Sequence, residues 1–280
     1  EQDLIRDNWG KYIYVRDNAS KQTWSLAWKP VSRKPDYYEC RHGVGYTTIN
    51  SVNCSIKSEM TVFVPPEDTL EVWLVKLVNE SAVPRSMTLF SYFEWFLGHA
   101  SESHRELHKL FIHTDYDKKK GIIFARKNDY FGFHAASIKP VSFDTDKETL
   151  IGMYGTLEHP AFLEKENCAR RQGRGNDAAA SLQLEVNLGP REEKEIVFLV
   201  GVNRSKPGIY RTVRKYDSPH KARISLDKTK TYWENLINKT VVKTQNKAFD
   251  IMTNTWLKYQ SVSGRINGRT AYYQTGGAIG

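Results

Sequence analysis

Histidine side chains gather in one short stretch of the sequence, next to a lysine. His99, His104, His108 and His113 follow the spacing H-x4-H-x3-H-x4-H. Histidine is a common zinc ligand, but this spacing is neither HExxH nor a paired zinc motif, and we predict no metal site. His108 and Lys109 are of more interest, because a sugar site needs neutral and cationic donors near hydroxyl or phosphate groups. The alternative is a polar loop whose histidines bond to the backbone.

Carboxylic groups are the second kind of side chain that could do chemistry. A glycosidase needs two of them facing each other across the scissile bond. Glu94 alternates with apolar residues in SYFEWF and could lie inside a strand, but a structural role explains it and the other candidates equally well. The candidates are Glu39, Glu94, Asp144, Asp146, Glu158 and Asp177. The sequence has no GxSxG, P-loop or GxGxxG motif, so a self-contained enzyme is not visible.

These side chains must be positioned mainly by strands. Between Lys11 and Val202, several segments are rich in Val, Ile, Tyr, Phe and Thr, and in SLQLEVNL every second residue is apolar, the pattern of a half-buried strand. Turn residues separate the segments, and we predict hairpins at 118–121 and 189–192. The pattern indicates a mainly β fold of antiparallel sheets packed as a sandwich. The segments are KYIYVR, CSIKSEMTVFVP, EVWLVKLVN, SMTLFSYFEWF, GIIFAR, YFGFHAAS, SLQLEVNL and KEIVFLVGV.

The period of the apolar residues changes from strand to helix after Lys206. Ser218 followed by Pro219 is a typical helix start. A second helix is predicted over 246–262, with Phe249, Met252, Trp256 and Tyr259 along one stripe. We expect these aromatic side chains to belong to a core. Residues 218–280 are then predicted to be the start of a helical domain whose remainder is absent.

The composition narrows the class of protein. Hydrophobic residues make up 40% of 280, enough for a large core, and a mean hydropathy of -0.57 argues against a membrane segment in this chain. Cys40, Cys54 and Cys168 form no CxxC pair, so a reducing, cytoplasmic setting fits best. No signal peptide is recognisable, and the first residues look like the middle of a domain. Sequons, which would matter only in a secreted chain, occur at Asn18, Asn53, Asn79, Asn203 and Asn238.

The positive charge is concentrated in one stretch. Residues 203–247 hold twelve Lys or Arg and three Asp or Glu, which gives +9, the net charge of the whole chain. The stretch lacks the aromatic and basic pattern of a nucleic-acid site, so no nucleic-acid partner is predicted. We interpret it as the solvated face of connecting helices. The alternative is a surface that docks an acidic partner domain or an anion.

Four stretches, in this order, resemble one known family. They are YYECRHGVGYTTI (37–49), FDTDKETLIGMYGTLEHP (143–160), TNTWLKYQ (253–260) and GRTAYYQTGGAIG (268–280). Together they resemble the glycoside hydrolase family 94 phosphorylases, which include cellobiose and chitobiose phosphorylases and a domain of cyclic β-1,2-glucan synthases. The resemblance implies an antiparallel super β-sandwich, a helical linker and an (α/α)6 barrel. We expect these at 1–205, 206–245 and, for the first part of a truncated barrel, 246–280.

The resemblance also implies a reaction. Inorganic phosphate, the co-substrate, attacks the anomeric carbon of a β-linked gluco-disaccharide or oligosaccharide with inversion, and one carboxylic acid protonates the leaving oxygen. No cofactor is expected. The acid is expected beyond Gly280, so we predict no catalytic residue and no activity in this chain alone. The implied partners are the oligosaccharide, phosphate, the remainder of the barrel and a second copy in a homodimer.

The resemblance suggests substrate-binding residues at two places. Arg269, Tyr273 and Gln274 match the approach to the donor-sugar site, where Arg269 could face an anion and Gln274 a hydroxyl; packing within the barrel is the alternative. His108 and Lys109 occupy the loop that reaches the acceptor in cellobiose-type members. YYQTGGAIG is closer to the glucan-synthase version, so the acceptor and linkage stay open. The alternative function is a non-catalytic carbohydrate-binding or scaffold sandwich of a larger glucan synthase.

Overall fold

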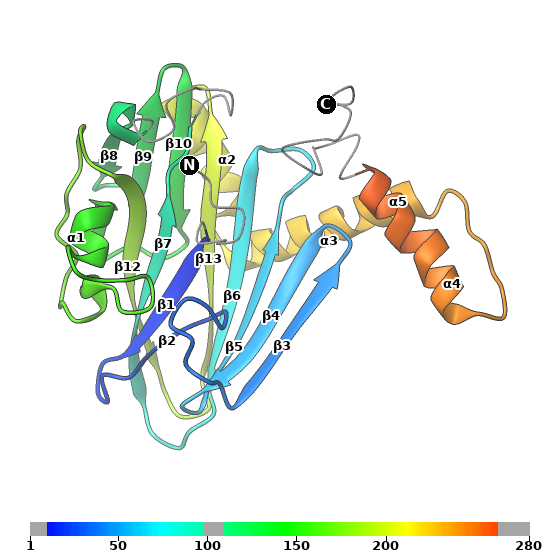
Figure 1. The fold of residues 1–280 in the computed structure, drawn as a ribbon, viewed down its shortest axis with the longest axis horizontal. Helices are drawn as coiled ribbons and strands as arrows, with labels where there is room; N and C mark the ends of the chain where they lie inside the picture. Colours follow the sequence, from blue (N-terminus) through cyan, green and yellow to red (C-terminus); the bar gives the residue numbers. More distant parts are fainter. Residues whose placement is uncertain (1–9, 98–108, 263–280) are drawn as a thin grey trace.

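The computed structural model describes residues 10–97 and 109–262, and in them two antiparallel sheets face each other (Figure 1). Within those residues the smaller sheet has the strand order β11-β12-β7-β1-β2 and the larger β3-β4-β5-β6-β13-β10-β9-β8. The smaller sheet comprises β1 (Tyr12–Asp17), β2 (Thr23–Ser25), β7 (Arg85–Glu94), β11 (Ser142–Asp146) and β12 (Ala178–Leu188). The larger comprises β3 (Tyr37–Gly43), β4 (Tyr46–Asn53), β5 (Ile56–Phe63), β6 (Leu70–Asn79), β8 (His113–Asp117), β9 (Ile122–Lys127), β10 (Tyr130–Ala136) and β13 (Glu193–Asn203).

The main core lies between the two sheets, which confirms the mainly β, antiparallel sandwich predicted from the sequence. The alternating residues of β12 point into it. Leu182, Leu184 and Val186 are buried there together with Trp73 and Phe198 from the larger sheet. Side chains of a strand alternate between the two faces of its sheet. The period-2 pattern therefore determines which face of each sheet is buried in the core.

One of the two predicted hairpins is wrong. Residues 118–121 do join the paired strands β8 and β9, with Gly121 at φ +69°. Residues 189–192, however, connect β12, which pairs with β7 and β11, to β13, which pairs with β6 and β10. The apolar faces of β12 and β13 pack against each other across the core. The turn at 189–192 therefore connects one sheet to the other. Asn79 supports this crossing by donating from Nδ2 to the carbonyl of Gly189 at 2.9 Å.

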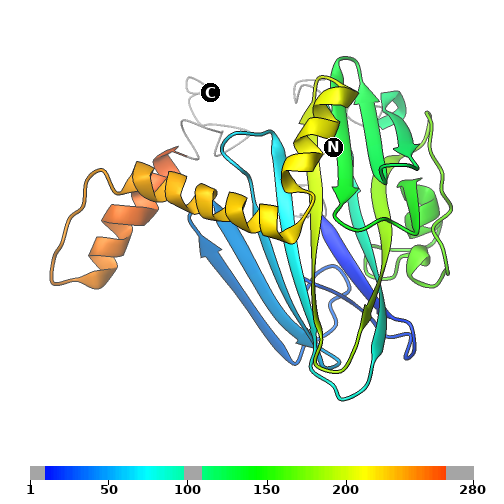
Figure 2. The same ribbon diagram turned by 180° about the vertical axis from the view of Figure 1, so that it is seen from behind.

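Helices cover part of the outer face of each sheet. Figure 2 shows α2 (Lys206–Tyr216) and α3 (Pro219–Ile237) lying across the larger sheet, where Ile209 and Leu226 pack on residues such as Val72 and Leu199. Tyr210 and Tyr216 also donate from Oη to Asp117 and Asp68, both at 2.7 Å. On the smaller sheet, α1 (Lys147–Ile151) and the 3-10 turn η2 (Ala161–Leu163) bury a third apolar cluster.

The helices of the C-terminal region differ from the sandwich in how far their apolar side chains are buried. Ser218 caps α3, as the sequence predicts. The second predicted helix begins after its cap Asn246 as α4 (Lys247–Ile251), continues through a π turn (Met252–Trp256) and passes into α5 (Leu257–Gln260). Phe249 and Trp256 of the predicted stripe are 51% and 46% exposed, so within the described residues they are not core. The strands end at Asn203, but the division at 205 and 245 stays a prediction.

Two further observations bear on the environment of the chain. Cys40, Cys54 and Cys168 are all free thiols. In the part of the chain that the structure describes, none of the helices combines the length and the apolar character that crossing a bilayer requires.

Candidate functional site

Charged side chains from four separate segments meet at one end of the smaller sheet. Glu94 is the last residue of β7, Asp177 directly precedes β12, and Lys147 opens α1. Lys109 joins them from the residues before β8. These four residues, called here the four-residue cluster, are brought together by the pairing of β7, β11 and β12.

Lysines and carboxylates alternate in the four-residue cluster. The Lys109 ammonium contacts the Glu94 carboxylate and lies 2.8 Å from Asp177 Oδ1. The Lys147 ammonium lies 3.0 Å from the other Glu94 oxygen, Oε1, to which Tyr92 Oη also donates at 3.1 Å. The side chains of Glu94 and Lys109 are only 9% and 17% exposed. Lys147 and Asp177 are more accessible, at 33% and 43%. The neighbouring lysines limit the cost of burying the Glu94 carboxylate.

The neighbouring lysine charges determine whether the Glu94 carboxyl group is ionised. Burial raises the pKa of Glu94, but hydrogen bonds and charges from Lys109 and Lys147 outweigh burial, and the pKa ends below its ordinary value. Burial and the neighbouring Glu94 raise the pKa of Tyr92, so the phenol stays a hydrogen-bond donor. A general acid needs a pKa raised towards neutrality. Glu94 is thus an anion that holds lysines, and it is unsuited to protonate a leaving group.

The FDTD motif builds the support for Lys147. Oδ1 of Asp144 accepts hydrogen bonds from the backbone N–H of Asp146 at 3.0 Å and from the Thr149 hydroxyl at 2.9 Å. Asp146 in turn caps α1 by accepting from the backbone N–H of Glu148. Side-chain caps of this kind fix where a helix begins. The motif therefore places Lys147 in the first turn of α1, beside Glu94.

Asp144 itself is a poor candidate for chemistry. Burial raises its pKa, which is the direction that a general acid needs. The residue is only 1% exposed, however, and is enclosed by the cap that it organises. A sugar oxygen cannot reach it.

The structure describes only one of the predicted binding residues. Lys109 lies in the four-residue cluster, where its ammonium is engaged by two carboxylates. His108, Arg269, Tyr273 and Gln274 lie outside the described residues, as do His99 and His104. His113 starts β8 and is exposed.

Sequence reasoning missed Lys147 altogether. It considered Glu94 and Asp177 only among several carboxylates and did not connect them with Lys109. A lysine directly after the FDTD cap is a usable signal for Lys147, since first-turn positions of helices are well defined. Nothing in the spacing of the sequence indicates that all four residues meet.

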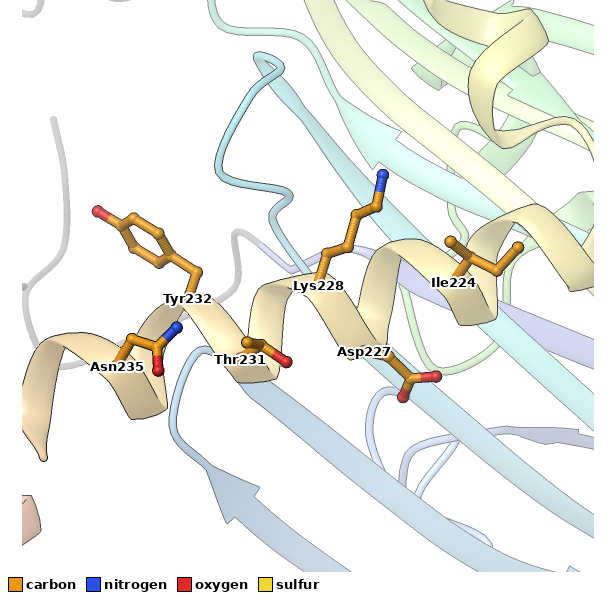
Figure 3. A pocket seen from close by; sticks show the side chains of 6 residues that line it. All are labelled: Ile224, Asp227, Lys228, Thr231, Tyr232 and Asn235. Atoms are coloured by element: carbon orange, nitrogen blue, oxygen red, sulfur yellow. The ribbon is translucent and has the colours of Figure 1, made fainter.

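The basic stretch is partly neutralised within the molecule. Its ion pairs connect α2 and α3 to each other and to the larger sheet. The pairs are Lys206–Asp115 at 2.7 Å, Lys215–Asp68 at 2.9 Å, Lys221–Asp217 at 2.7 Å, and Arg223–Glu195. Figure 3 shows the outward side of α3, where a shallow hollow of about 510 Å³ is lined by Ile224, Asp227, Lys228, Thr231, Tyr232 and Asn235. All six come from one helix at spacings of one turn, so the hollow is the solvent face of α3.

The comparison with protein families agrees with this architecture. The model described as "Glycosyl hydrolase 94, supersandwich domain" matches residues 1–219, and "Glycosyl hydrolase 94 superfamily, catalytic domain" matches residues 232–280. This chain belongs to glycoside hydrolase family 94. The resemblance first seen in four sequence stretches is thereby confirmed over most of the chain.

Three curated relatives illustrate the family. Solabiose phosphorylase of Paenibacillus borealis is 30% identical over 92% of this chain and 35% of its own length. N,N'-diacetylchitobiose phosphorylase of Vibrio proteolyticus is 27% identical over 98% of this chain and 35% of its own length. The cyclic β-(1,2)-glucan synthase NdvB of Rhizobium meliloti is 27% identical over 99% of this chain and 10% of its own length. The chain thus spans about a third of the phosphorylases and a tenth of the synthase.

Proposed function

We propose that this chain is the N-terminal part of an inverting β-glycoside phosphorylase. The substrates would be a β-linked gluco-disaccharide or oligosaccharide and inorganic phosphate. One observation carries the proposal: the match to the family's supersandwich model over 1–219 is followed, after a short interval, by a match to its catalytic-domain model at 232–280. Two phosphorylases align over more than 90% of this chain.

The proposed reaction needs one carboxylic acid. Phosphate attacks the anomeric carbon from the face opposite the leaving oxygen, and the acid protonates that oxygen as the bond breaks. Phosphate takes the place of the activated water, so no second carboxylate is required as a base. Glu94 is held as an anion and Asp144 is inaccessible. This supports the proposal that the acid belongs to the catalytic domain beyond Gly280.

The sandwich would contribute positioning. His108 directly precedes Lys109 in the sequence, and the Lys109 ammonium is fixed by Glu94 and Asp177. We propose that this anchoring sets the backbone next to an acceptor-side residue. Arg269, Tyr273 and Gln274 remain the proposed contacts on the donor side.

We further propose a cytoplasmic homodimer, as the family resemblance implies. The three free cysteines support a reducing compartment. Two of the sequons, at Asn53 and Asn79, are buried, so a glycan could not be attached there without disrupting the fold. A homodimer would be visible as twice the monomer mass in light scattering of the full-length protein.

A second function is favoured by one observation. The aligned relative NdvB is by name a glucan synthase, of which this chain corresponds to 10%. The sandwich could therefore be a non-catalytic carbohydrate-binding or scaffold module of a larger synthase.

Assays of β-1,2-, β-1,3- and β-1,4-linked glucosides with the full-length protein separate the two functions. We expect phosphate-dependent release of an α-sugar 1-phosphate, identified by its anomeric proton in NMR. The 280-residue chain should show no turnover, because losing the general acid alone costs about 10²- to 10⁴-fold in rate and losing the positioning of two reactants costs more. Turnover by the 280-residue chain would refute the assignment of the acid. A folded full-length protein inactive on every linkage would favour the scaffold.

A further inference from the structure

A hollow on the outer face of the larger sheet is built by three neighbouring strands. Its volume is about 410 Å³. Unlike the hollow on α3, whose lining comes from one helix, it takes side chains from β3, β4 and β5, and we call it the β3–β5 groove. The lining residues on these strands are Tyr37, Glu39, Arg41, Asn50, Val52 and Lys57.

The strand register arranges the lining in two rows across the sheet. Tyr37 is opposite Val52, which in turn is opposite Lys57. Glu39 is opposite Asn50 in the next row. Because every second side chain of a strand points to the same face, both rows lie on one side of the sheet. The first row offers a ring, a branched aliphatic side chain and the methylene stem of a lysine, whereas the second row is polar.

The groove shares its face of the sheet with α3 but lies at the other end of the strands. Tyr46, which faces the same side of β4 as Val52, is contacted by the Lys230 ammonium of α3 at 4.9 Å from the ring centre. Tyr37 is the first residue of β3, at the opposite end from the turn into β4. Figure 2 shows α3 passing near that turn. The helix therefore leaves the groove open.

The backbone around the groove is fixed by hydrogen bonds. β4 pairs with β3 on one side and with β5 on the other. Beyond the strand ends, the N–H of Asp36 donates to the Val52 carbonyl and the N–H of Glu80 donates to the Ser55 carbonyl, both at 2.8 Å. Glu80 also lines the groove. A ligand would therefore meet a preformed surface, which reduces the entropy lost on binding.

The charges of the groove cancel. Two carboxylates, Glu39 and Glu80, stand against two cations, Arg41 and Lys57, so the net charge of the lining is zero. Arg41 Nη2 lies 2.8 Å from Glu39 Oε1. An anionic ligand such as phosphate or a nucleic acid would be repelled by the carboxylates as much as it is attracted by the cations. The lining instead favours a neutral ligand that both donates and accepts hydrogen bonds.

A β-linked glucose chain has the matching chemistry. Its pyranose rings carry hydroxyl groups around the edge and apolar C–H groups on both faces. The ring of Tyr37, whose residue is 49% exposed, and the side chain of Val52 can contact such a face. The Asn50 amide and the flanking charged groups can bond the hydroxyls. Apolar and aromatic contacts combined with a few polar groups are typical of small-molecule sites.

The placement of the groove favours a sugar over a peptide. Extended peptides bind a sheet by adding a strand at its edge, whereas the two rows run across the face of three strands. Three strands cover two interstrand spacings, about 10 Å, which suits a short stretch of sugar rings.

We propose that the β3–β5 groove is a surface binding site for a neutral β-linked gluco-oligosaccharide. The inference rests on the proposed function for the identity of the sugar. The site is distinct from the four-residue cluster, which lies at an end of the smaller sheet. A glucan held in the groove would stay near the protein between turnovers, which raises its effective concentration.

NMR titration of the isotopically labelled 280-residue chain tests the groove without reference to activity. The probes are glucotrioses with β-1,2, β-1,3 or β-1,4 linkages, added without phosphate. At least one should bind with a dissociation constant on the order of 1 mM. Tyr37→Ala should weaken this binding about tenfold while the spectrum stays that of a folded chain, and Tyr37→Phe should retain it. Excess inorganic phosphate should not displace the sugar.

Tyr154→Ala is the matched control. This tyrosine follows α1 and is 95% exposed, and Figure 1 shows α1 and β3 on opposite sides of the molecule. Its truncation should leave glucotriose binding unchanged.

Three results would overturn the proposal. One is no binding of any glucotriose, and another is equal affinity in Tyr37→Ala and the unaltered chain. The third is binding by the 280-residue chain that is absent from the full-length protein, because another part of the polypeptide or a second copy would then cover the groove. Groove binding in a full-length protein without phosphorolysis would count against the phosphorylase function alone.

Discussion

The sandwich and the C-terminal helices contain equally regular apolar patterns but bury them to different degrees. In the sandwich, Leu184 and Phe198 are fully buried between the sheets. In α4 and the π turn, Phe249, Met252 and Trp256 are about half exposed. Amphipathic patterns show which face of an element is to be covered, and they do not show whether the cover lies in the same segment of chain. The sandwich covers its own apolar faces, whereas the apolar stripe of α4–α5 stays about half exposed within the described residues.

Truncation of one aromatic residue in each region should have very different effects. Phe198→Ala should lower the free energy of unfolding of the 280-residue chain by about 3–5 kcal/mol, because the cavity would lie in the main core beside Trp73. Trp256→Ala should change it by less than about 0.5 kcal/mol. Urea denaturation of both variants measures the difference. Equal losses would mean that α4–α5 belongs to the cooperative unit of the sandwich, and the comparison would fail.

Ion pairs in the two regions can be compared in the same way, by the stability lost when one partner is removed. Glu94→Ala removes the shared partner of Lys109 and Lys147 in a largely buried place, and we expect a loss of about 2–3 kcal/mol. Asp217→Ala breaks the exposed pair with Lys221 between α2 and α3 and should cost less than about 0.5 kcal/mol. Denaturant titrations at pH 7 measure both. A loss from Asp217→Ala as large as that from Glu94→Ala would contradict the distinction.

The Glu94 contribution should also depend on pH in a defined direction. The pKa of Glu94 is lower in the folded than in the unfolded chain. Its stabilisation is therefore complete above the unfolded pKa, near 4.3 for a free glutamate, and is lost as the pH falls through the lower folded value. Glu94→Ala should weaken this acid-induced loss.

His134 gives the sandwich a further pH dependence at less acidic pH. Its ring is buried between the sheets, where Nδ1 donates to the Leu199 carbonyl at 2.9 Å and Nε2 accepts from the Ser91 hydroxyl at 2.7 Å. Burial lowers the pKa of His134 to about 4. The unfolded chain binds this proton more readily, so stability is complete above pH 6.5 and decreases as the pH falls towards 4.

Between pH 7 and pH 5 this loss should be about 2 kcal/mol. Unfolding free energies of the 280-residue chain at the two pH values measure it, and His134→Gln should remove the slope. An unchanged slope in that variant would show that another group is responsible. The C-terminal helices that the structure describes contribute no comparable buried histidine, since His220 in α3 is exposed.

The apolar strands could be predicted from the sequence, but the way they pair into sheets could not. β6 and β13 are recognisable because their side chains alternate or form long β-branched runs. β3 and β4 were missed because Glu39, Arg41 and Asn50 make the outer face of this sheet edge polar. The turn at 189–192 looks like a hairpin locally, and only the packing of both apolar faces against each other shows that β12 and β13 belong to different sheets.

The candidate site was predictable only in fragments. Lys109 was noticed because it follows His108, and Glu94 because it alternates with apolar residues in SYFEWF. The meeting of Glu94 with Asp177 depends on the pairing of β7 with β12, between residues more than eighty positions apart. Local sequence patterns carry no information about that pairing. The stripe on α4–α5 is a similar case, because the helical pattern was predicted correctly, whereas its burial was not: Phe249 and Trp256 are about half exposed within the described residues.

Limited proteolysis of the 280-residue chain tests most directly whether the sandwich is a complete unit and the helical region is not. The first cuts should fall between 203 and 250, above all in the exposed connection 238–246 between α3 and α4, or after residue 262. A sandwich fragment should then persist, as identified by mass spectrometry. Early cleavage within 56–97, which contains β5, β6 and β7, would contradict the account.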